Sequence, residues 1–351
     1  MNIGGRKADH IALCSDDGVA FRSRTTLFEQ VQLVHDALPD LSMDDIDPSC
    51  MLLGKKLRAP IVIAAMTGGT DEARAINREL ASIAEERGYA FALGSQRAMH
   101  VRPVSRATFE VRDVAPTIPL FGNIGVVQAR AMATNAVQEL VAAVGADALC
   151  VHLNPAMELV QPGGDRDFSG GLDTIARLAR DLRVPVVVKE TGCGLSRSVG
   201  ERVRRVGVRF ADVSGAGGTS WVGVETKRAK EAGDARSFAL GEAFWDWGVP
   251  TAASVAQLAP LGFEAIIATG GVASGVDLAR AIALGATAGG IARPVLIALR
   301  EGGRRGAISF FERVEEELRA VMLLTGSRDL AALRRAPRII GGELRRWMED
   351  P

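Results

Sequence analysis

Short apolar runs recur along the chain, and each run is followed by glycine or polar residues and then by an amphipathic stretch. The runs cover residues 60–65, 89–93, 119–123, 146–153, 184–189, 210–213, 264–268 and 287–291. Apolar residues recur three and four positions apart in the stretches 72–87, 134–144, 171–182, 196–206, 251–258 and 275–284. Runs of this length are typical of buried strands, and the spacing between them is typical of helices.

Eight strands that alternate with helices predict a parallel sheet, and eight repeats predict its closure into a (β/α)₈ TIM barrel. The alternative is an open, doubly wound sheet. Two observations disfavour that alternative. No GxGxxG motif follows the first run, and small, polar or cationic residues cluster after nearly every run.

Two segments lie outside the repeat. Residues 1–58 precede the first run and are expected to form an N-terminal extension over one end of the barrel. Residues 304–348 are expected to form a C-terminal helical tail, with an amphipathic helix over 310–324 that stops at Gly326 and a charged helix after it. The polar stretch 222–244 is weakly periodic and predicts a flexible loop on the active-site face. No linker is evident, so residues 1–351 are taken as a single domain.

Composition narrows the class of protein. The 351 residues include 42 Lys and Arg against 42 Asp and Glu, so the formal net charge is zero. This balance argues against a nucleic-acid-binding or membrane-surface protein. Apolar residues make up 47% of the chain, but no apolar run reaches the roughly 18 residues of a membrane span. The polar start resembles no signal peptide, and the four cysteines form no CxxC pair, so a cytoplasmic enzyme is expected.

The candidate chemistry lies directly after the apolar runs, where the loops of a barrel begin. Glycines 270 and 271 follow the seventh run, and Arg293 follows the eighth. Backbone N–H groups, a helix N-terminus and a cation would meet there, as in the phosphate sites of this fold. Gly217 and Gly218 add a second potential phosphate nest. The alternative is that these glycines only permit tight turns and that Arg293 lies on the surface.

Three other positions at or after the ends of apolar runs carry side chains that could take part in catalysis or ligand binding. Lys189 ends a very apolar run, so it forms a Schiff base, contacts an anionic cofactor, or pairs in the core with Glu190 or Asp212. Asn123 would bond a ring edge or simply satisfy a turn. His152 ends the fourth run, and Asn154 points to the same side two residues later, which favours binding or proton transfer.

These residues form part of a longer series of motifs. It comprises Arg6-Lys7 with His10, Ala65-Met66-Thr67-Gly68-Gly69, Gly94-Ser95-Gln96-Arg97, His152-Leu153-Asn154 with Glu158 and Gln161, Val188-Lys189-Glu190, and Ser214-Gly215-Ala216-Gly217-Gly218-Thr219-Ser220-Trp221. In order and spacing, the series closely resembles the type 2 isopentenyl diphosphate isomerases. The resemblance implies a cytoplasmic FMN-dependent (β/α)₈ enzyme, a homotetramer or homo-octamer. It also implies a requirement for Mg²⁺ and for reduced flavin, which NADPH can supply.

The resemblance also implies roles for individual residues. FMN would be bound by Ala65, Met66, Thr67, Ser95, Asn123, Lys189, Ser214 and Thr219, with its phosphate on Gly270, Gly271, Val272, Ala292 and Arg293. The substrate, isopentenyl or dimethylallyl diphosphate, would be held by Arg6, Lys7, His10, Ser95, Gln96 and Arg97, with Met157 in the substrate site. Glu158 would bind Mg²⁺, and the catalytic residues would be His152, Asn154, Gln161 and Lys189.

One residue departs from the family pattern. The family sequence after the histidine is His-x-Asn-x-x-Gln-Glu, and Met157 occupies the glutamine position here. A thioether cannot relay a proton. Gln161, one helical turn later, would replace the glutamine, the flavin alone would handle both proton steps, or the enzyme would act on a modified or bulkier prenyl diphosphate. The further alternatives are an oxidoreductase of the same superfamily and a flavin-binding protein without activity.

Overall fold

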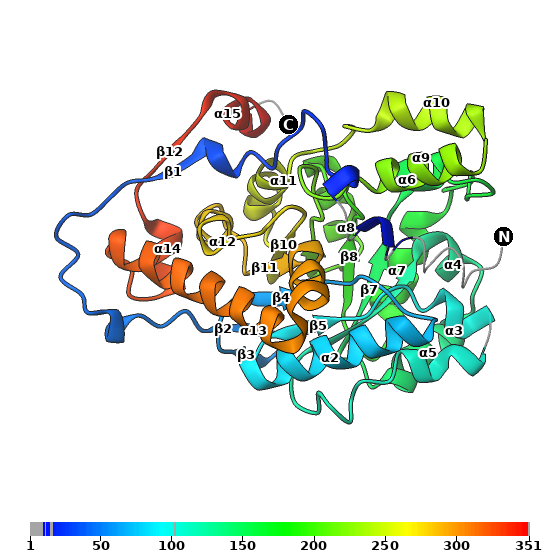
Figure 1. Ribbon diagram of the computed structural model, residues 1–351, viewed down its shortest axis with the longest axis horizontal. Coiled ribbons are helices and arrows are strands. Elements are labelled where there is room, and N and C mark those ends of the chain that lie inside the picture. Colours follow the sequence, from blue (N-terminus) through cyan, green and yellow to red (C-terminus); the bar gives the residue numbers. More distant parts are fainter. Residues whose placement is uncertain (1–9, 11, 15–16, 102, 350–351) are drawn as a thin grey trace.

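Eight parallel strands close into a barrel in the computed structural model, which describes residues 10, 12–14, 17–101 and 103–349 (Figure 1). Around the barrel the strands follow the order β10-β11-β4-β5-β6-β7-β8-β9. They are β4 (Ile61–Ile63), β5 (Ala90–Ala92), β6 (Leu120–Gly125), β7 (Ala148–His152), β8 (Val186–Lys189), β9 (Phe210–Asp212), β10 (Ala265–Thr269) and β11 (Ala288–Ile291). Each predicted apolar run overlaps one of these strands, although β6 and β10 extend past the predicted ends, and the predicted TIM barrel is confirmed.

The barrel interior is filled by every second residue of the strands, because successive side chains of a strand point to opposite faces. Phe121, Cys150, Val187 and Ile267 belong to this inner cluster. It continues below the barrel into Leu52 and Leu57, which come from the hairpin of β2 (Cys50–Leu52) and β3 (Lys55–Leu57). The hairpin therefore closes the end of the barrel where the strands begin.

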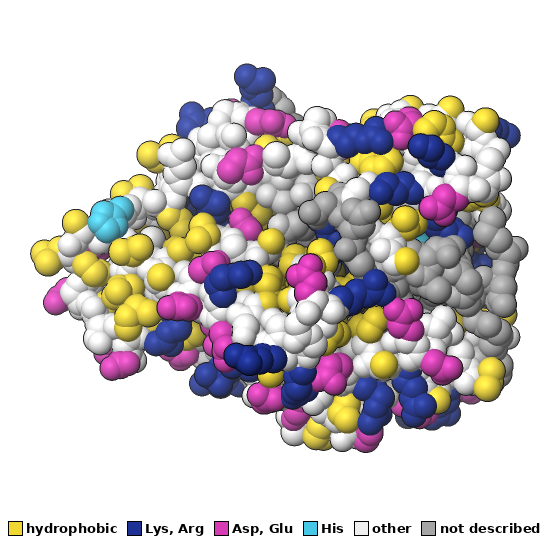
Figure 2. All heavy atoms as spheres, viewed as in Figure 1, with side chains coloured by type: hydrophobic (Ala, Val, Ile, Leu, Met, Phe, Trp, Pro, Cys, Tyr) yellow, Lys and Arg dark blue, Asp and Glu magenta, His cyan; other side chains and the backbone are white. Residues whose placement is uncertain are grey.

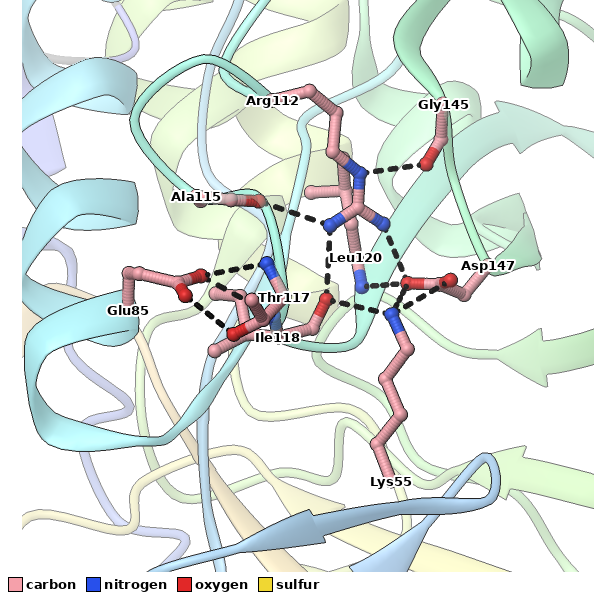
Figure 3. Close-up of polar contacts among 9 residues, drawn as sticks. All are labelled: Lys55, Glu85, Arg112, Ala115, Thr117, Ile118, Leu120, Gly145 and Asp147. Atoms are coloured by element: carbon pink, nitrogen blue, oxygen red, sulfur yellow. Dashed lines mark hydrogen bonds and ion pairs between the residues drawn. The ribbon is translucent and has the colours of Figure 1, made fainter.

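A network of charged side chains fastens this hairpin to the barrel (Figure 3). Lys55 Nζ lies 2.9 Å from both carboxylate oxygens of Asp147, which directly precedes β7. Arg112 also donates to Asp147 Oδ2 and to the carbonyl of Ile118. Burial opposes ionisation of Asp147, but hydrogen bonds from Lys55, the Leu120 N–H and Arg112 outweigh it and hold the carboxyl pKa below its usual value. The network is structural, since it lies at the barrel end opposite the strand C-termini.

The helices expected between the strands are present within one residue of the predicted bounds. They are α2 (Asp71–Arg87), α5 (Thr134–Val144), α7 (Gly171–Asp181), α8 (Arg197–Arg205), α11 (Thr251–Leu258) and α12 (Gly275–Ala283). Short helices in the loops are α3 (Arg97–Val101), α4 (Val126–Arg130) and α6 (Pro155–Val160). In α2 the local signals are clear: the Thr70 side chain caps the first turn, and Gly88 ends the helix at φ 67°.

The prediction of a flexible loop over residues 222–244 is wrong. This stretch folds as two helices, α9 (Trp221–Glu231) and α10 (Ala235–Phe244). The periodicity is weak because α9 buries charged as well as apolar side chains. Glu225 and Arg228 are both buried and form an ion pair of 2.6 Å. Each charge is thus compensated inside the fold, a pairing that the sequence pattern does not reveal.

The C-terminal tail is helical, as predicted, but contains a strand as well. A long helix, α13 (Arg293–Leu324), is kinked at Gly303, and Gly326 follows its end at φ 62°. Two short helices follow, α14 (Leu330–Arg335) and α15 (Gly342–Glu349). Between them, β12 (Arg338–Ile340) pairs antiparallel with β1 (Val31–Leu33). A segment from the N-terminal extension and a segment from the C-terminal tail therefore lie side by side next to the barrel (Figure 1).

The surface carries both signs of charge. Figure 2 shows Lys and Arg side chains interspersed with Asp and Glu over the visible face. In the described part of the chain, no helix combines the length and apolarity needed to cross a membrane.

Candidate active site

A deep cavity of about 450 Å³ opens at the C-terminal ends of the barrel strands. Residues that end or follow all eight strands line it, among them Ala65, Ser95, Asn123 and His152 from the first four. Lys189, Ser214, Thr269 and Ala292 represent the second four. This is the end at which TIM barrels carry their functional groups.

Strand alternation explains why polar side chains reach the cavity. Phe121, Cys150, Val187 and Ile267 fill the apolar interior. Two residues further along the same strands, on the same face, are Asn123, His152, Lys189 and Thr269. The residues that end the strands thus form a polar layer above an apolar core.

Asn123 fixes the orientation and protonation of His152. The Asn123 amide nitrogen donates to the carbonyl of Leu93 at 3.1 Å, so its oxygen must face His152 Nδ1, which lies 2.8 Å away. An amide oxygen only accepts, so Nδ1 carries the proton. Gly125 permits this arrangement, because a Cβ there would lie 2.9 Å from His152 Nε2. Of the two ring nitrogens, Nε2 is therefore the one without this proton.

Lys189 is buried at the end of β8 and lines the cavity. Its Nζ donates to the carbonyl of Glu190 at 2.7 Å and lies 3.5 Å from Asp212 Oδ2. The pairing with Asp212 is one of the alternatives that the sequence left open, and it coexists with exposure to the cavity. A buried cation here would favour negative charge on a bound ring.

Glu190 points away from the cavity and anchors the loop after β8. Its Oε2 accepts the backbone N–H groups of Thr191 and Cys193. Burial raises the pKa of the Glu190 carboxyl to about 7, although these N–H groups and Lys189 pull it downward. Thr191 and Gly192 of this loop line the cavity.

A second cluster surrounds Glu158 on α6. Asn154 Nδ2 donates to Oε1 at 2.9 Å, and Gln161 Nε2 and the Asp165 N–H donate to Oε2 at 3.1 and 2.8 Å. Glu158 is buried and lines the cavity with Asn154 and Gln161. Within the described residues these three neutral donors leave the negative charge and roughly one lone-pair direction of the carboxylate for a cation.

The far side of the cavity suits a phosphate. Gly270 and Gly271 have φ values of 106° and 77°, and both line the cavity with the first residue of α13, Arg293. A Cβ on Gly218 would lie 2.4 Å from the Gly271 nitrogen, so glycine is required for the two loops to approach. Backbone N–H groups of the glycine turn, the N-terminus of α13 and Arg293 could together bind an anion there.

Four buried polar atoms have no partner within the described residues. They are Thr67 Oγ1, Gln161 Oε1, Thr191 Oγ1 and Thr269 Oγ1. All four residues line the cavity. Buried polar atoms are normally hydrogen-bonded. Their convergence on one cavity indicates that they bind a ligand rich in donors and acceptors.

The comparisons with known proteins agree with this geometry. A model of the FMN-dependent dehydrogenase family matches residues 2–168 and 155–339. A Methanosarcina barkeri protein named isopentenyl-diphosphate delta-isomerase is 43% identical over 96% of this chain and 92% of its own. A Methanothermobacter thermautotrophicus protein of the same name is 43% identical over 99% of this chain and 96% of its own.

The chain belongs to the isopentenyl-diphosphate delta-isomerase family. Solved structures show the shared fold at much lower identity. A mandelate oxidase variant with benzaldehyde is 18% identical, with a TM-score of 0.67 over 96% of this chain and 95% of its own. A second, with a monooxide FMN adduct, is 16% identical, with a TM-score of 0.63 over 95% of this chain and 92% of its own.

Most residues that the family resemblance implicates lie together in this cavity. They are His10, Ala65, Met66, Thr67, Ser95, Arg97, Asn123, His152, Asn154, Met157, Glu158, Gln161, Lys189, Ser214, Thr219, Gly270, Gly271, Val272, Ala292 and Arg293. Arg6 and Lys7 lie outside the described residues. His10 Nε2 lies 2.7 Å from Glu225 Oε1, which places this histidine against α9.

Gln96 departs from its expected role. Its side chain is fully buried and does not line the cavity. Its Nε2 donates to the carbonyl of Leu140 at 2.9 Å, and its Oε1 accepts the Asn123 N–H at 2.9 Å. Both ends of this amide thus bind the protein, so the predicted contact of Gln96 with a diphosphate finds no support in these contacts. Gln96 instead supports the strand end that carries Asn123.

Five described cavity residues with a polar, aromatic or thiol side chain were given no role by the sequence. Thr191 and Thr269 follow strands directly, and that position is the signal that could have revealed them. Gln128 and Trp221 reach the cavity from the starts of helices, and Cys14 comes from the N-terminal extension. Burial raises the pKa of the Cys14 thiol to about 12, so it lines the cavity as a neutral group.

Proposed function

We propose that this protein interconverts isopentenyl diphosphate and dimethylallyl diphosphate by a 1,3-allylic proton shift on reduced FMN with Mg²⁺. The observation that carries the proposal is the cavity itself. A chain that belongs to this isomerase family brings a phosphate nest, a buried lysine and a histidine–asparagine pair together around one cavity. The relatives' name supplies the substrate, and the polar atoms without partners support a bound cofactor.

FMN suits the residues of the upper cavity. Its ring and ribityl chain would be held by Ala65, Met66, Thr67, Ser95, Asn123, Lys189, Ser214 and Thr219. Its phosphate would be held by Gly270, Gly271, Val272, Ala292 and Arg293. When bound and reduced, FMN supplies an electron-rich ring that stabilises positive charge developing on a neighbouring alkene and that can carry the exchanged proton. Lys189, a cation at the cavity wall, would favour the anionic form of that ring.

The substrate diphosphate would be bound by Ser95 and Arg97 together with Arg6, Lys7 and His10 of the N-terminal extension. No group of three or more acidic, histidine or cysteine side chains in the described ranges is arranged to hold a metal ion. Mg²⁺ is commonly bound by one or two carboxylates together with substrate phosphates. Glu158 fits that role, because neutral amides hold its carboxylate in place.

Proton transfer would be shared between His152 and the cluster around Glu158. Because Asn123 holds the proton on His152 Nδ1, Nε2 would exchange a proton on the cavity side. Gln161 would orient a proton-carrying group through its Oε1, which has no partner in the described part of the chain. Asn154 would hold Glu158 in place. Met157 lines the same wall and gives it an apolar surface.

That apolar wall favours a second candidate, in which the same reaction is performed on a modified or bulkier prenyl diphosphate. The remaining features of the proposal come from the family resemblance: NADPH as the reductant, a homotetramer or homo-octamer, and a cytoplasmic location.

The test is to purify the protein, add FMN and Mg²⁺, reduce the flavin with dithionite or NADPH, and follow isopentenyl diphosphate by proton NMR. Conversion to dimethylallyl diphosphate supports the proposal. Flavin binding without conversion overturns it. Longer prenyl diphosphates, tested in parallel, would reveal the second candidate if they react while isopentenyl diphosphate does not.

A further inference from the structure

Asp212 lies next to Lys189 at the carboxyl edge of the barrel. The two residues pair across β8 and β9, and each side chain is 8% exposed. Asp212 is two residues beyond Phe210 of the inner cluster, so it points into the barrel like Lys189. Unlike Lys189, it does not line the cavity.

The two oxygens of Asp212 contact two residues of the cavity wall. Oδ2 lies 3.5 Å from Lys189 Nζ, and Oδ1 accepts the Ser214 N–H at 3.3 Å. Ser214 has a φ of 39°, a left-handed conformation that is uncommon for a residue with a side chain. Asp212 therefore contacts two residues of the cavity wall without lining the cavity itself.

The charge of Lys189 has one compensating partner. Across the described ranges of the chain, Asp212 supplies the one carboxylate within ion-pair distance of Nζ. The other bond of Nζ goes to the neutral carbonyl of Glu190. A lysine side chain that bonds only one neutral carbonyl retains rotamer freedom. A second contact, with a carboxylate, fixes both the position and the direction of the ammonium group.

We propose that Asp212 is a positioning residue, which acts through Lys189 to hold the ammonium group toward the flavin ring. This inference rests on the proposed FMN site. A buried ion pair is weak evidence for a gain in stability, because the desolvation cost offsets much of the attraction. The position of the pair at the cavity wall gives it a role in binding instead.

The experiment is a double-mutant cycle on the FMN-loaded protein, with sulfite as the probe. Sulfite adds reversibly to oxidised flavin and places negative charge on the ring, so its affinity reports the cation beside the ring. Asp212→Asn keeps the shape and can still accept the Ser214 N–H through Oδ1, but loses the charge. We expect it to weaken sulfite binding about tenfold, a coupling typical of contacting charged groups.

The same substitution in a Lys189→Met background should change sulfite affinity less than about twofold, because the residue through which Asp212 acts is gone. Equal losses in both backgrounds would overturn the inference, since they would indicate a purely structural role. Asp113→Asn is the matched control: Asp113 is 62% exposed and pairs with Arg78 on the surface, so its loss should leave sulfite affinity unchanged.

Thermal stability gives a second measurement if Asp212→Asn folds poorly. That variant leaves a buried cation without its partner, and Lys189→Met/Asp212→Asn removes both charges. The double variant should therefore unfold at a higher temperature than Asp212→Asn alone. No recovery would show that the pair is not coupled and would overturn the inference. If the unaltered protein binds no FMN, the proposed function itself fails, which separates that outcome from the others.

Discussion

The loop that carries Thr191 and Gly192 is held by the buried carboxyl of Glu190. The pH dependence of the unfolding free energy tests how strongly this burial opposes ionisation of Glu190. The carboxyl is 5% exposed, and burial raises its pKa to about 7 from the ordinary value of 4.5. The folded protein therefore holds this proton more tightly than the unfolded chain does. The difference between the two values corresponds to about 3 kcal/mol of unfolding free energy.

A raised carboxyl pKa lowers stability as the pH rises. Below pH 4.5 the carboxyl is neutral in both states and costs nothing. Between pH 4.5 and 7 the unfolded chain ionises first, so the folded state loses stability progressively, and above pH 7 the loss levels off. From pH 5 to pH 8 the expected loss from this one group is about 2 kcal/mol.

Glu190→Gln removes the ionisation but keeps an oxygen that can accept the Thr191 and Cys193 N–H groups. The unfolding free energy of the variant minus that of the unaltered protein should therefore rise by about 2 kcal/mol from pH 5 to pH 8. Urea unfolding at four pH values and constant ionic strength measures this difference. Glu110→Gln, at a side chain 47% exposed, is the control and should give no slope.

A flat difference for Glu190→Gln, or one that falls with pH, would refute the reasoning. It would mean that ionisation of Glu190 does not lower the stability of the folded protein. The hydrogen bonds from the loop would then stabilise the carboxylate more than burial destabilises it.

Three further predictions concern the cavity wall and the base of the barrel. Gln161→Ala should reduce turnover at least about a hundredfold while FMN affinity stays within about twofold, by steady-state kinetics and fluorescence titration; unchanged turnover would remove Gln161 from the mechanism. Met157→Gln should raise kcat/KM for isopentenyl diphosphate if Met157 redirects substrate choice, and no gain would count against that idea. Asp147→Asn should lower the unfolding free energy by about 2 kcal/mol in chemical denaturation, because Lys55 and Arg112 lose a half-buried partner (Figure 3); an unchanged midpoint would contradict this.

Local sequence patterns predicted the barrel and several of the residues that line its cavity. Strands and crossover helices follow from apolar periodicity, and the residues that end the strands are brought together by the topology. His152 and Lys189 could be assigned to one cavity for that reason, before any contact was known.

The features that the sequence did not predict depend on distant contacts. Gln96 follows a strand, like the true cavity residues, but its amide bonds Leu140, which is 44 positions away. The helix α9 was not predicted because its buried face includes charged residues, which interrupt the apolar periodicity that indicates a helix. The pairing of β1 with β12 joins segments about 300 residues apart in the sequence, and no local pattern predicts it.

The central claim is that a flat flavin lies across the barrel mouth, with its phosphate at Gly270, Gly271 and Arg293 and one edge beside Lys189. A crystal structure of the protein grown with FMN tests it most directly. We expect electron density for the ring over the strand ends, with Lys189 Nζ within hydrogen-bond distance of the ring edge. An empty mouth, or a lysine directed away from the ring, would contradict it.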